Sequence, residues 1–258
     1  IDLLAHKEQT AKVTKQALKI FKTSAQSKLL RNVQNSADLL SRALENSLSA
    51  EDLTAIMEKI PPEKLRPLLL EKNNFGQTPL HQALNKQQPP ETIRLLLTQT
   101  PADLLPQILC IQDNYGWTPL HLATEAANFT AIIECLPKST SGGFWPQALL
   151  SQDNNGHTPL HRALNKGAPP FIIGQILDSL NPTAVAEILQ LQDRDGFTPL
   201  QLALQKAADT PILEILLAKT SAANMPQLLQ TQDRYGQTPL HLIAKAQNPT
   251  AIMALFFP

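Results

Sequence analysis

The chain of 258 residues is short of net charge, of cysteine and of long apolar runs. Its 22 Lys and Arg residues balance 22 Asp and Glu residues, which excludes a protein that binds nucleic acid through overall charge. Cys110 and Cys135 are too few for a disulfide framework and lack zinc-site spacing, so we expect a reducing compartment, the cytoplasm. No run of about 18 apolar residues occurs, and no transmembrane helix is predicted.

Glycine is scarce, with 9 residues, whereas proline is frequent, with 21, and one repeated motif explains much of both counts. Five segments begin 40 residues apart: GQTPLHQAL at Gly76, GWTPLHLAT at Gly116, GHTPLHRAL at Gly156, GFTPLQLAL at Gly196 and GQTPLHLIA at Gly236. Glycine suits a tight turn, threonine caps a helix, and proline fits the first helical position. Each motif therefore predicts a turn followed by a capped helix, with an Asp or Asn three residues before the glycine bonding the turn backbone.

Two further apolar segments follow each motif. The first begins at a proline or capping residue and carries pairs such as Ile93 and Leu96, which predicts a second helix. The next, such as residues 104–109, predicts an extra helix of about two turns. Strands are hardly indicated. The fold class is predicted as all-α, an α-solenoid of repeats with a helical N-terminal cap.

The 40-residue frame extends backward to a degenerate first repeat, because Leu40, Ala43 and Leu44 align with the helix that follows Gly76. The predicted domains are an N-terminal helical segment, residues 1–35, and a repeat array, residues 36–258. Its repeats are 36–75, 76–115, 116–155, 156–195, 196–235 and 236–258, of which the last is incomplete. The start at Ile1 without methionine predicts a fragment, and Phe256 and Phe257 are expected near an open end that a cut or another segment explains.

Residues 1–35 carry 7 Lys and Arg residues against 2 acidic ones, with apolar positions at helical spacing. A basic amphipathic helix can bind an anionic membrane. A cap packed on the first repeat, or a connector to an upstream domain, is the favoured interpretation, because an array end needs covering.

The D-x-x-G-x-T-P-L-H-x-A pattern resembles the ankyrin repeat over about residues 36–258, with four TPLH motifs and one TPLQ at Gln201. The repeats are longer than the usual period of about 33 residues, and the surplus coincides with the extra apolar segment. Enlarged, Gln- and Leu-rich repeats behind a helical segment also resemble host-translocated effectors of intracellular bacteria, which implies the host cell cytoplasm.

The motif histidines, His81, His121, His161 and His241, invite a metal hypothesis. Packed helices lie about 8–10 Å apart, whereas zinc needs several ligands at about 2 Å, so no metal site is expected. The resemblance implies instead that each bonds turn backbone and ties one repeat to the next. No phosphate-binding loop and no Cys–His catalytic set is evident, so no cofactor and no enzymatic activity are predicted for this chain.

The resemblance places a partner-binding groove at the turn tips and at the exposed ends of the first helices. The predicted partner-binding residues are Phe75, Lys86, Tyr115, Trp117, His157, Lys166, Arg194, Phe197, Lys206, Arg234, Tyr235 and Lys245. Aromatic residues and arginine dominate interface hot spots, and the set is basic. The alternative is that the rings stack on neighbouring turns and the lysines merely solvate the surface.

We therefore predict a monomeric, non-enzymatic scaffold whose groove binds an acidic and apolar segment of a partner protein. One alternative is the substrate-recruiting part of an enzyme, or of a bacterial effector, whose catalytic domain lies outside this chain. Another is membrane attachment through residues 1–35.

Overall fold

The computed structural model describes residues 36–45, 47–58, 60, 62–124, 126–135, 144–206 and 210–256. Every regular element in these ranges is a helix, seventeen in all, and none is a strand. The predicted helix in residues 1–35 lies outside them. The chain divides into two compact parts, residues 1–114 and residues 115–258.

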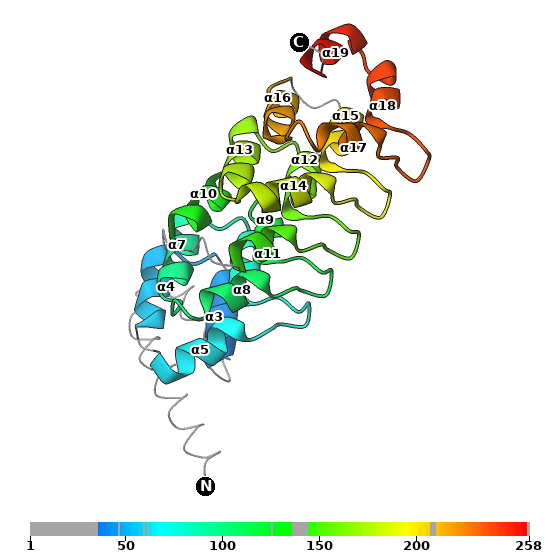
Figure 1. Cartoon of the computed structure of the whole chain (residues 1–258). Coiled ribbons are helices and arrows are strands. Elements are labelled where there is room, and N and C mark those ends of the chain that lie inside the picture. The colour runs from blue at the N-terminus through cyan, green and yellow to red at the C-terminus, as the bar shows by residue number, and fades with distance from the viewer. Residues whose placement is uncertain are drawn as a thin grey trace. The chain divides into compact units, whose positions relative to one another are not determined.

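The N-terminal part contains six described helices: α3 (Ser36–Glu45), α4 (Ala50–Met57), α5 (Pro62–Leu70), α6 (Pro79–Asn85), α7 (Pro90–Thr98) and α8 (Leu105–Cys110). Helix α3 packs on α6, and α4 packs on α7 (Figure 1). Leu40, Ala43 and Leu53 have no exposed surface. Residues 36–70 thus repeat the helix order of the next segment although they lack the turn motif.

The C-terminal part contains eleven described helices: α9 (Pro119–Leu122), α10 (Ala126–Cys135), α11 (Phe144–Leu150), α12 (Pro159–Asn165), α13 (Pro170–Asp178), α14 (Pro182–Gln190), α15 (Pro199–Gln205), α16 (Thr210–Lys219), α17 (Met225–Gln230), α18 (Pro239–Lys245) and α19 (Pro249–Phe256). Helices α9, α12, α15 and α18 form an inner row, and α10, α13, α16 and α19 form an outer row (Figure 1). The short helices α11, α14 and α17 confirm the predicted extra helix and lead into the turns.

The inner helices begin as the motif predicts. Thr158 is the N-cap of α12, with an extended backbone, and Pro159 is the first helical residue. Ala163 and Ala203 have no exposed surface, so these small residues allow α12 and α15 to pack closely. The same cap and proline open α6, α9, α15 and α18.

Candidate partner-binding surface

Each turn before an inner helix is shaped by one carboxylate or amide side chain. Asp153 Oδ1 accepts the N–H groups of Asn155 at 2.7 Å and of His157 at 2.9 Å. Asp193 Oδ1 does the same for Asp195 and Phe197, each at 2.9 Å. This is the predicted role of the polar residue ahead of the glycine, and it fixes the two residues that form the turn tip.

Adjacent turn tips in the C-terminal part are bonded to one another through the backbone. The N–H of Asn154 donates to Tyr115 O at 3.1 Å, that of Arg194 to Asn155 O at 2.9 Å, and that of Arg234 to Asp195 O at 2.9 Å. In the N-terminal part, Asn114 N–H donates to Phe75 O at 3.0 Å. The tips are therefore held in fixed positions by their neighbours.

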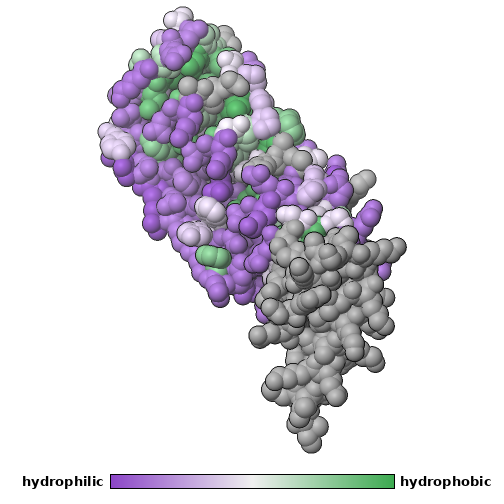
Figure 2. Space-filling view, turned by 180° about the vertical axis from the view of Figure 1, so that it is seen from behind, coloured by the Kyte–Doolittle hydropathy of each residue, from purple (hydrophilic) through white to green (hydrophobic). Residues whose placement is uncertain are grey.

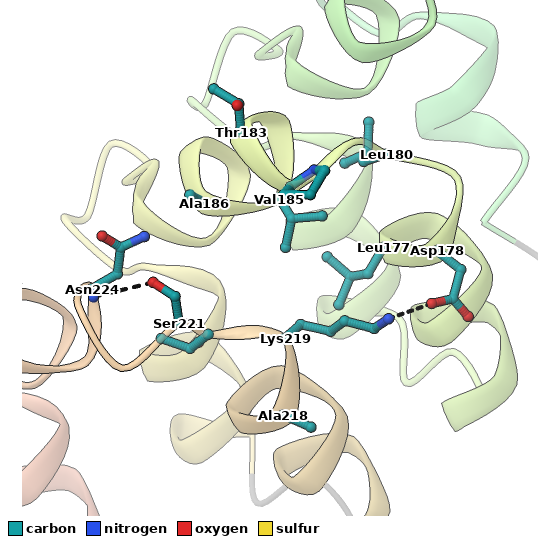
Figure 3. A pocket seen from close by; sticks show the side chains of 12 residues that line it. Leu177, Asp178, Leu180, Thr183, Val185, Ala186, Ala218, Lys219, Ser221 and Asn224 are labelled. Atoms are coloured by element: carbon teal, nitrogen blue, oxygen red, sulfur yellow. Dashed lines mark hydrogen bonds and ion pairs between the residues drawn. The ribbon is translucent and has the colours of Figure 1, made fainter. Parts of the chain in front are cut away.

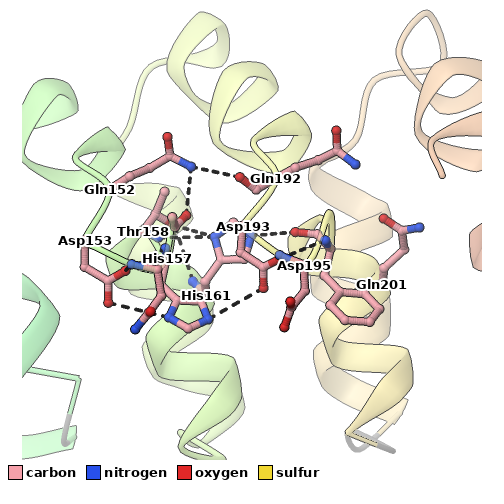
Figure 4. A network of polar contacts seen from close by, with 12 residues as sticks. Gln152, Asp153, His157, Thr158, His161, Gln192, Asp193, Asp195 and Gln201 are labelled. Carbon is pink, nitrogen blue, oxygen red and sulfur yellow. Dashed lines mark hydrogen bonds and ion pairs between the residues drawn. The ribbon is translucent and has the colours of Figure 1, made fainter. Parts of the chain in front are cut away.

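Glutamine side chains add a second set of links that the sequence interpretation missed. Gln152 Nε2 donates to Gly156 O at 2.7 Å and to Gln192 O of the next turn at 2.9 Å (Figure 4). Gln192 Nε2 donates to Gln232 O at 2.9 Å. The signal was present, because a Gln precedes the Asp in four successive turns, at positions 112, 152, 192 and 232.

The motif histidines tie one repeat to the next, as the resemblance implied. The N–H of Thr158 donates to His161 Nδ1, so Nε2 is left as the donor, and it lies 3.1 Å from Phe197 O. His121 Nε2 lies 2.9 Å from His157 O, and Gln201 Nε2 makes the same link to Gln237 O at 2.9 Å. Burial lowers the pKa of His121 and of His161 to about 4, so both rings are neutral at physiological pH.

In two repeats of the C-terminal part, the residue between the glycine and the threonine of the motif reaches the Asp of the next turn. Trp117 Nε1 donates to Asp153 Oδ2 at 3.0 Å. His157 lies between two carboxylates: its Nδ1 is 3.5 Å from Asp153 Oδ2 and its Nε2 is 3.6 Å from Asp193 Oδ2 (Figure 4). Hydrogen bonding to Asp153 and then to Asp193 raises the pKa of His157 to about 9, so this half-buried ring is cationic at neutral pH.

Partial burial alone would raise the pKa of Asp153, but its hydrogen bonds from His157 lower it to about 2. Phe197 has no donor to offer, and Asp233 Oδ2 is buried without a partner among the described residues.

The structure sorts the predicted binding residues into exposed and packed ones. Phe75, Tyr115 and Tyr235 are each more than half exposed at turn tips, and Lys86, Lys166, Arg194, Lys206 and Lys245 are exposed. Arg234 is exposed but engaged, because it pairs with Asp195 and lies over the Tyr235 ring at 4.7 Å. These eight exposed residues, together with Arg234, remain candidate contacts for a partner protein.

Phe197, Trp117 and His157 differ from the expectation of free surface side chains. Phe197 is only 5% exposed, so it cannot be a contact on this surface, because its ring is packed inside the turn layer. Trp117 is half-buried: Arg162 lies 3.8 Å over its ring, and Tyr115 stacks beside it at 5.3 Å. His157 is committed to its two carboxylates. For these three residues the structure favours the stacking alternative.

Charge is segregated between the two faces of the C-terminal part. Among described residues, the turn tips and inner helix ends expose Lys166, Lys206, Lys245, Arg194 and Arg234, against one partly exposed acid, Asp195. The remaining turn carboxylates, Asp153, Asp193 and Asp233, are buried. The outer helices and the short helix α14 carry the acids Glu134, Asp178, Glu187 and Glu214, with Lys219 as their one described cation. The turn side is thus the basic side.

A groove of about 520 Å³ opens on the outer side, between the α13–α14 and α16–α17 segments (Figure 3). Leu177, Leu180 and Val185 line it, and the ion pair of Lys219 with Asp178, at 2.5 Å, crosses one end. Lys219 and Asp178 are the charged residues of its lining.

No cluster of metal-ligating side chains occurs within the described ranges. Among the same residues, no helix is both long enough and apolar enough to cross a membrane. Cys110 and Cys135 both lie at partly buried positions. Partial burial raises the pKa of Cys110, which disfavours a reactive thiolate there.

Comparisons with known proteins agree with this architecture. Residues 53–142 match the family model of ankyrin repeats (3 copies). The crystal structure of EF0377, an ankyrin repeat protein, superposes with a TM-score of 0.61 at 15% sequence identity, over 84% of this chain and 95% of that chain. No curated protein sequence matches the chain.

Proposed function

We infer the function of this chain from its membership of the ankyrin-repeat proteins, whose repeats generally act as protein–protein interaction modules. We propose that it is a non-enzymatic binding module that holds an acidic and apolar segment of a partner protein. The site is the turn-tip surface of the C-terminal part, defined here as Tyr115, Lys166, Arg194, Lys206, Arg234, Tyr235 and Lys245. Phe75 and Lys86 take the same positions within the N-terminal part.

One observation carries this proposal: the exposed cations of the C-terminal part gather on the turn side, and exposed aromatic rings stand among them. Lys166, Arg194 and Lys206 form no ion pair with a described residue, so their charges are available to a partner. Tyr115 and Tyr235 offer rigid apolar area at low entropic cost. Acidic side chains of a partner would gain from these charges mainly in association rate and specificity.

The preformed shape of the surface supports the same function. Backbone, glutamine and histidine links hold neighbouring turns together, so the tips need little reordering when a partner binds. A binding surface that is already ordered loses less conformational entropy on association. This favours recognition of an extended segment that crosses several tips.

Selection from a random peptide display library on the immobilised chain tests the proposal. We expect enriched peptides to combine Asp or Glu with aromatic residues. Lys206→Glu should weaken their binding about 5- to 10-fold. Lys219→Glu makes the same charge change on the outer helix α16 and should leave affinity nearly unchanged. Equal losses from the two variants, or enriched peptides without acidic residues, would contradict the proposed surface.

A second matched pair tests the aromatic contribution. Tyr115 is 53% exposed on a turn tip and Phe171 is 54% exposed on outer helix α13. Tyr115→Ala should cost about 2 kcal/mol of binding, the scale of an interface hot spot, while Phe171→Ala should cost little. Thermal melting of both variants separates loss of contact from loss of stability.

The other expectations stay predictions. A catalytic domain outside this chain, an effector role in a host cytoplasm and membrane attachment through residues 1–35 concern segments that the structure does not describe. Co-sedimentation with anionic liposomes, before and after deletion of residues 1–35, addresses the last of these.

A further inference from the structure

One inner helix of the C-terminal part carries an arginine where the other three carry a leucine. The position directly follows the motif histidine or glutamine. Leu122, Leu202 and Leu242 occupy it in α9, α15 and α18 and are 4–8% exposed. Arg162 occupies it in α12 and is partly exposed. Since leucine meets the packing needs of this position in three repeats, the stacking of the repeats does not require an arginine here.

The guanidinium of Arg162 is held in a fixed place. It lies 3.8 Å from the centroid of the Trp117 ring, and Trp117 is itself anchored because its Nε1 donates to the buried Asp153 Oδ2 at 3.0 Å. An arginine stacked on an aromatic face keeps its N–H groups in the plane of the guanidinium, where a carboxylate can accept two of them side by side. The stacking also limits the side-chain entropy that Arg162 would lose on binding.

An exposed aromatic ring continues this stack at the turn tip. The centroid of Tyr115 lies 5.3 Å from that of Trp117, and Tyr115 is 53% exposed. Exposed apolar surface is otherwise scarce, since the face shown in Figure 2 is mainly hydrophilic outside the C-terminal helices. We call Tyr115, Trp117 and Arg162 the Tyr–Trp–Arg stack. It offers an exposed ring and a cation that are joined through one indole.

We propose that the Tyr–Trp–Arg stack determines specificity on the turn-tip surface, by recognising an acidic and an apolar residue two positions apart in an extended partner segment. The carboxylate accepts two N–H groups of Arg162, and the apolar side chain packs on Tyr115. A guanidinium has five N–H groups, so two can serve a partner whatever else Arg162 contacts. This proposal rests on the proposed function, and it makes Trp117 a positioning residue.

The spacing follows from the geometry of an extended chain. Side chains at i and i+2 lie on one face of a strand, about 7 Å apart. That separation is comparable with the contacts of 5.3 Å and 3.8 Å, laid end to end, that lead from Tyr115 to the Arg162 guanidinium. Side chains at i and i+1 point to opposite faces, so they cannot both reach the stack.

Peptides selected on the immobilised chain, titrated by calorimetry, test this proposal. We expect their acidic and aromatic residues to recur two positions apart. Arg162→Leu should weaken such a peptide about tenfold, but should have little effect on a peptide whose acid is replaced by its amide. Arg162→Lys should lose most of the same affinity, because an ammonium keeps the charge without the planar fork. Leucine at three equivalent positions indicates that Arg162→Leu folds, and thermal melting checks it.

The matched control is Arg194→Leu, which removes the same charge from a turn tip and should weaken the acid and amide peptides by similar small factors. Equal losses of both peptides with Arg162→Leu, full affinity with Arg162→Lys, or selected peptides without the two-position spacing would overturn the proposal. If Lys206→Glu weakens the selected peptides and Arg162→Leu does not, the stack is refuted while the proposed function stands. Selected peptides without acidic residues would refute both.

Discussion

We call the contact between two successive turns a joint. Two neighbouring joints of the C-terminal part share the same backbone hydrogen bond but differ in side-chain chemistry, since one is ionic and the other is apolar. At the joint between the turns at Asp153 and Asp193, the cationic ring of His157 links two carboxylates. At the joint between Asp193 and Asp233, the equivalent residue is the buried Phe197, and Asp233 Oδ2 is left without a partner. The repeat thus fixes where two turns meet, while one variable residue decides whether charge or apolar packing holds them.

The largest effect is expected at the apolar joint. Phe197→Ala should destabilise the protein by about 3–5 kcal/mol, since it leaves a cavity where a large ring is buried. The loss should be nearly independent of pH, because no titrating group is removed. Urea denaturation at several pH values measures it. A loss below that of His157→Gln would mean that the ring contributes less than its burial indicates.

At the apolar joint, the close approach of the two turns can be tested by substituting Gly196. Gly196 has a φ of 81°, and an added Cβ would lie 2.7 Å from Arg234 N. Gly196→Ala should cost about 3 kcal/mol, from left-handed strain and from a forced backbone shift. Gly236 has a φ of 74° with open space around it, so Gly236→Ala should cost only about 1–2 kcal/mol of strain. Equal losses in urea denaturation would show that the turns separate easily.

The stability that the ionic joint contributes should depend on pH. The pKa of His157 is raised from 6.5 to about 9, so its stabilisation is complete below pH 6.5 and is lost as pH rises through about 9. His157→Gln should cost about 1–2 kcal/mol at neutral pH, a range that allows for the partial exposure of the ring. Gln77 and Gln237 occupy the same position, so the turn accepts glutamine. The stability curves of variant and parent should converge above pH 9; parallel curves would refute the ionic link.

The smallest effects are expected when the carboxylate at each joint, Asp193 or Asp233, is replaced by asparagine. Asn73 shapes the turn of its own repeat, with Oδ1 accepting from Phe75 N at 2.9 Å and Gln77 N at 3.0 Å, so asparagine supports this turn. Asp193→Asn removes a charge that faces His157 and should cost about 1 kcal/mol at neutral pH. Asp233→Asn keeps the Oδ1 acceptor of Tyr235 N and Gln237 N and removes a charge whose Oδ2 has no hydrogen-bond partner among the described residues, so it should be neutral or slightly stabilising. A reversed order in thermal melts would contradict the assigned pairing.

Much of the fold was predictable because its signals are local and repeated. Threonine and proline fix the helix starts, and Asp193 and its equivalents shape the turns through residues two and four positions ahead. The extra short helix was predicted for the same reason. The candidate surface was predicted less well. Exposure of Tyr115 agrees with the prediction, whereas Phe197 is buried and Trp117 and His157 are packed against neighbouring groups.

The repeat of 40 residues, the capped helices and the histidine links could be predicted from the amino-acid sequence, because each depends on a pattern within one repeat or on its regular recurrence. The glutamine links recur just as regularly, but their geometry became evident only in the structure. The tertiary structure alone decided which variable side chains face solvent. The environment of a turn residue is set by the residue opposite it, about 36 positions later in the chain, as with His157 and Asp193. The stacking of the repeats decides whether a turn residue faces a carboxylate, as His157 does, is buried, as Phe197 is, or has open space beside it, as Gly236 does.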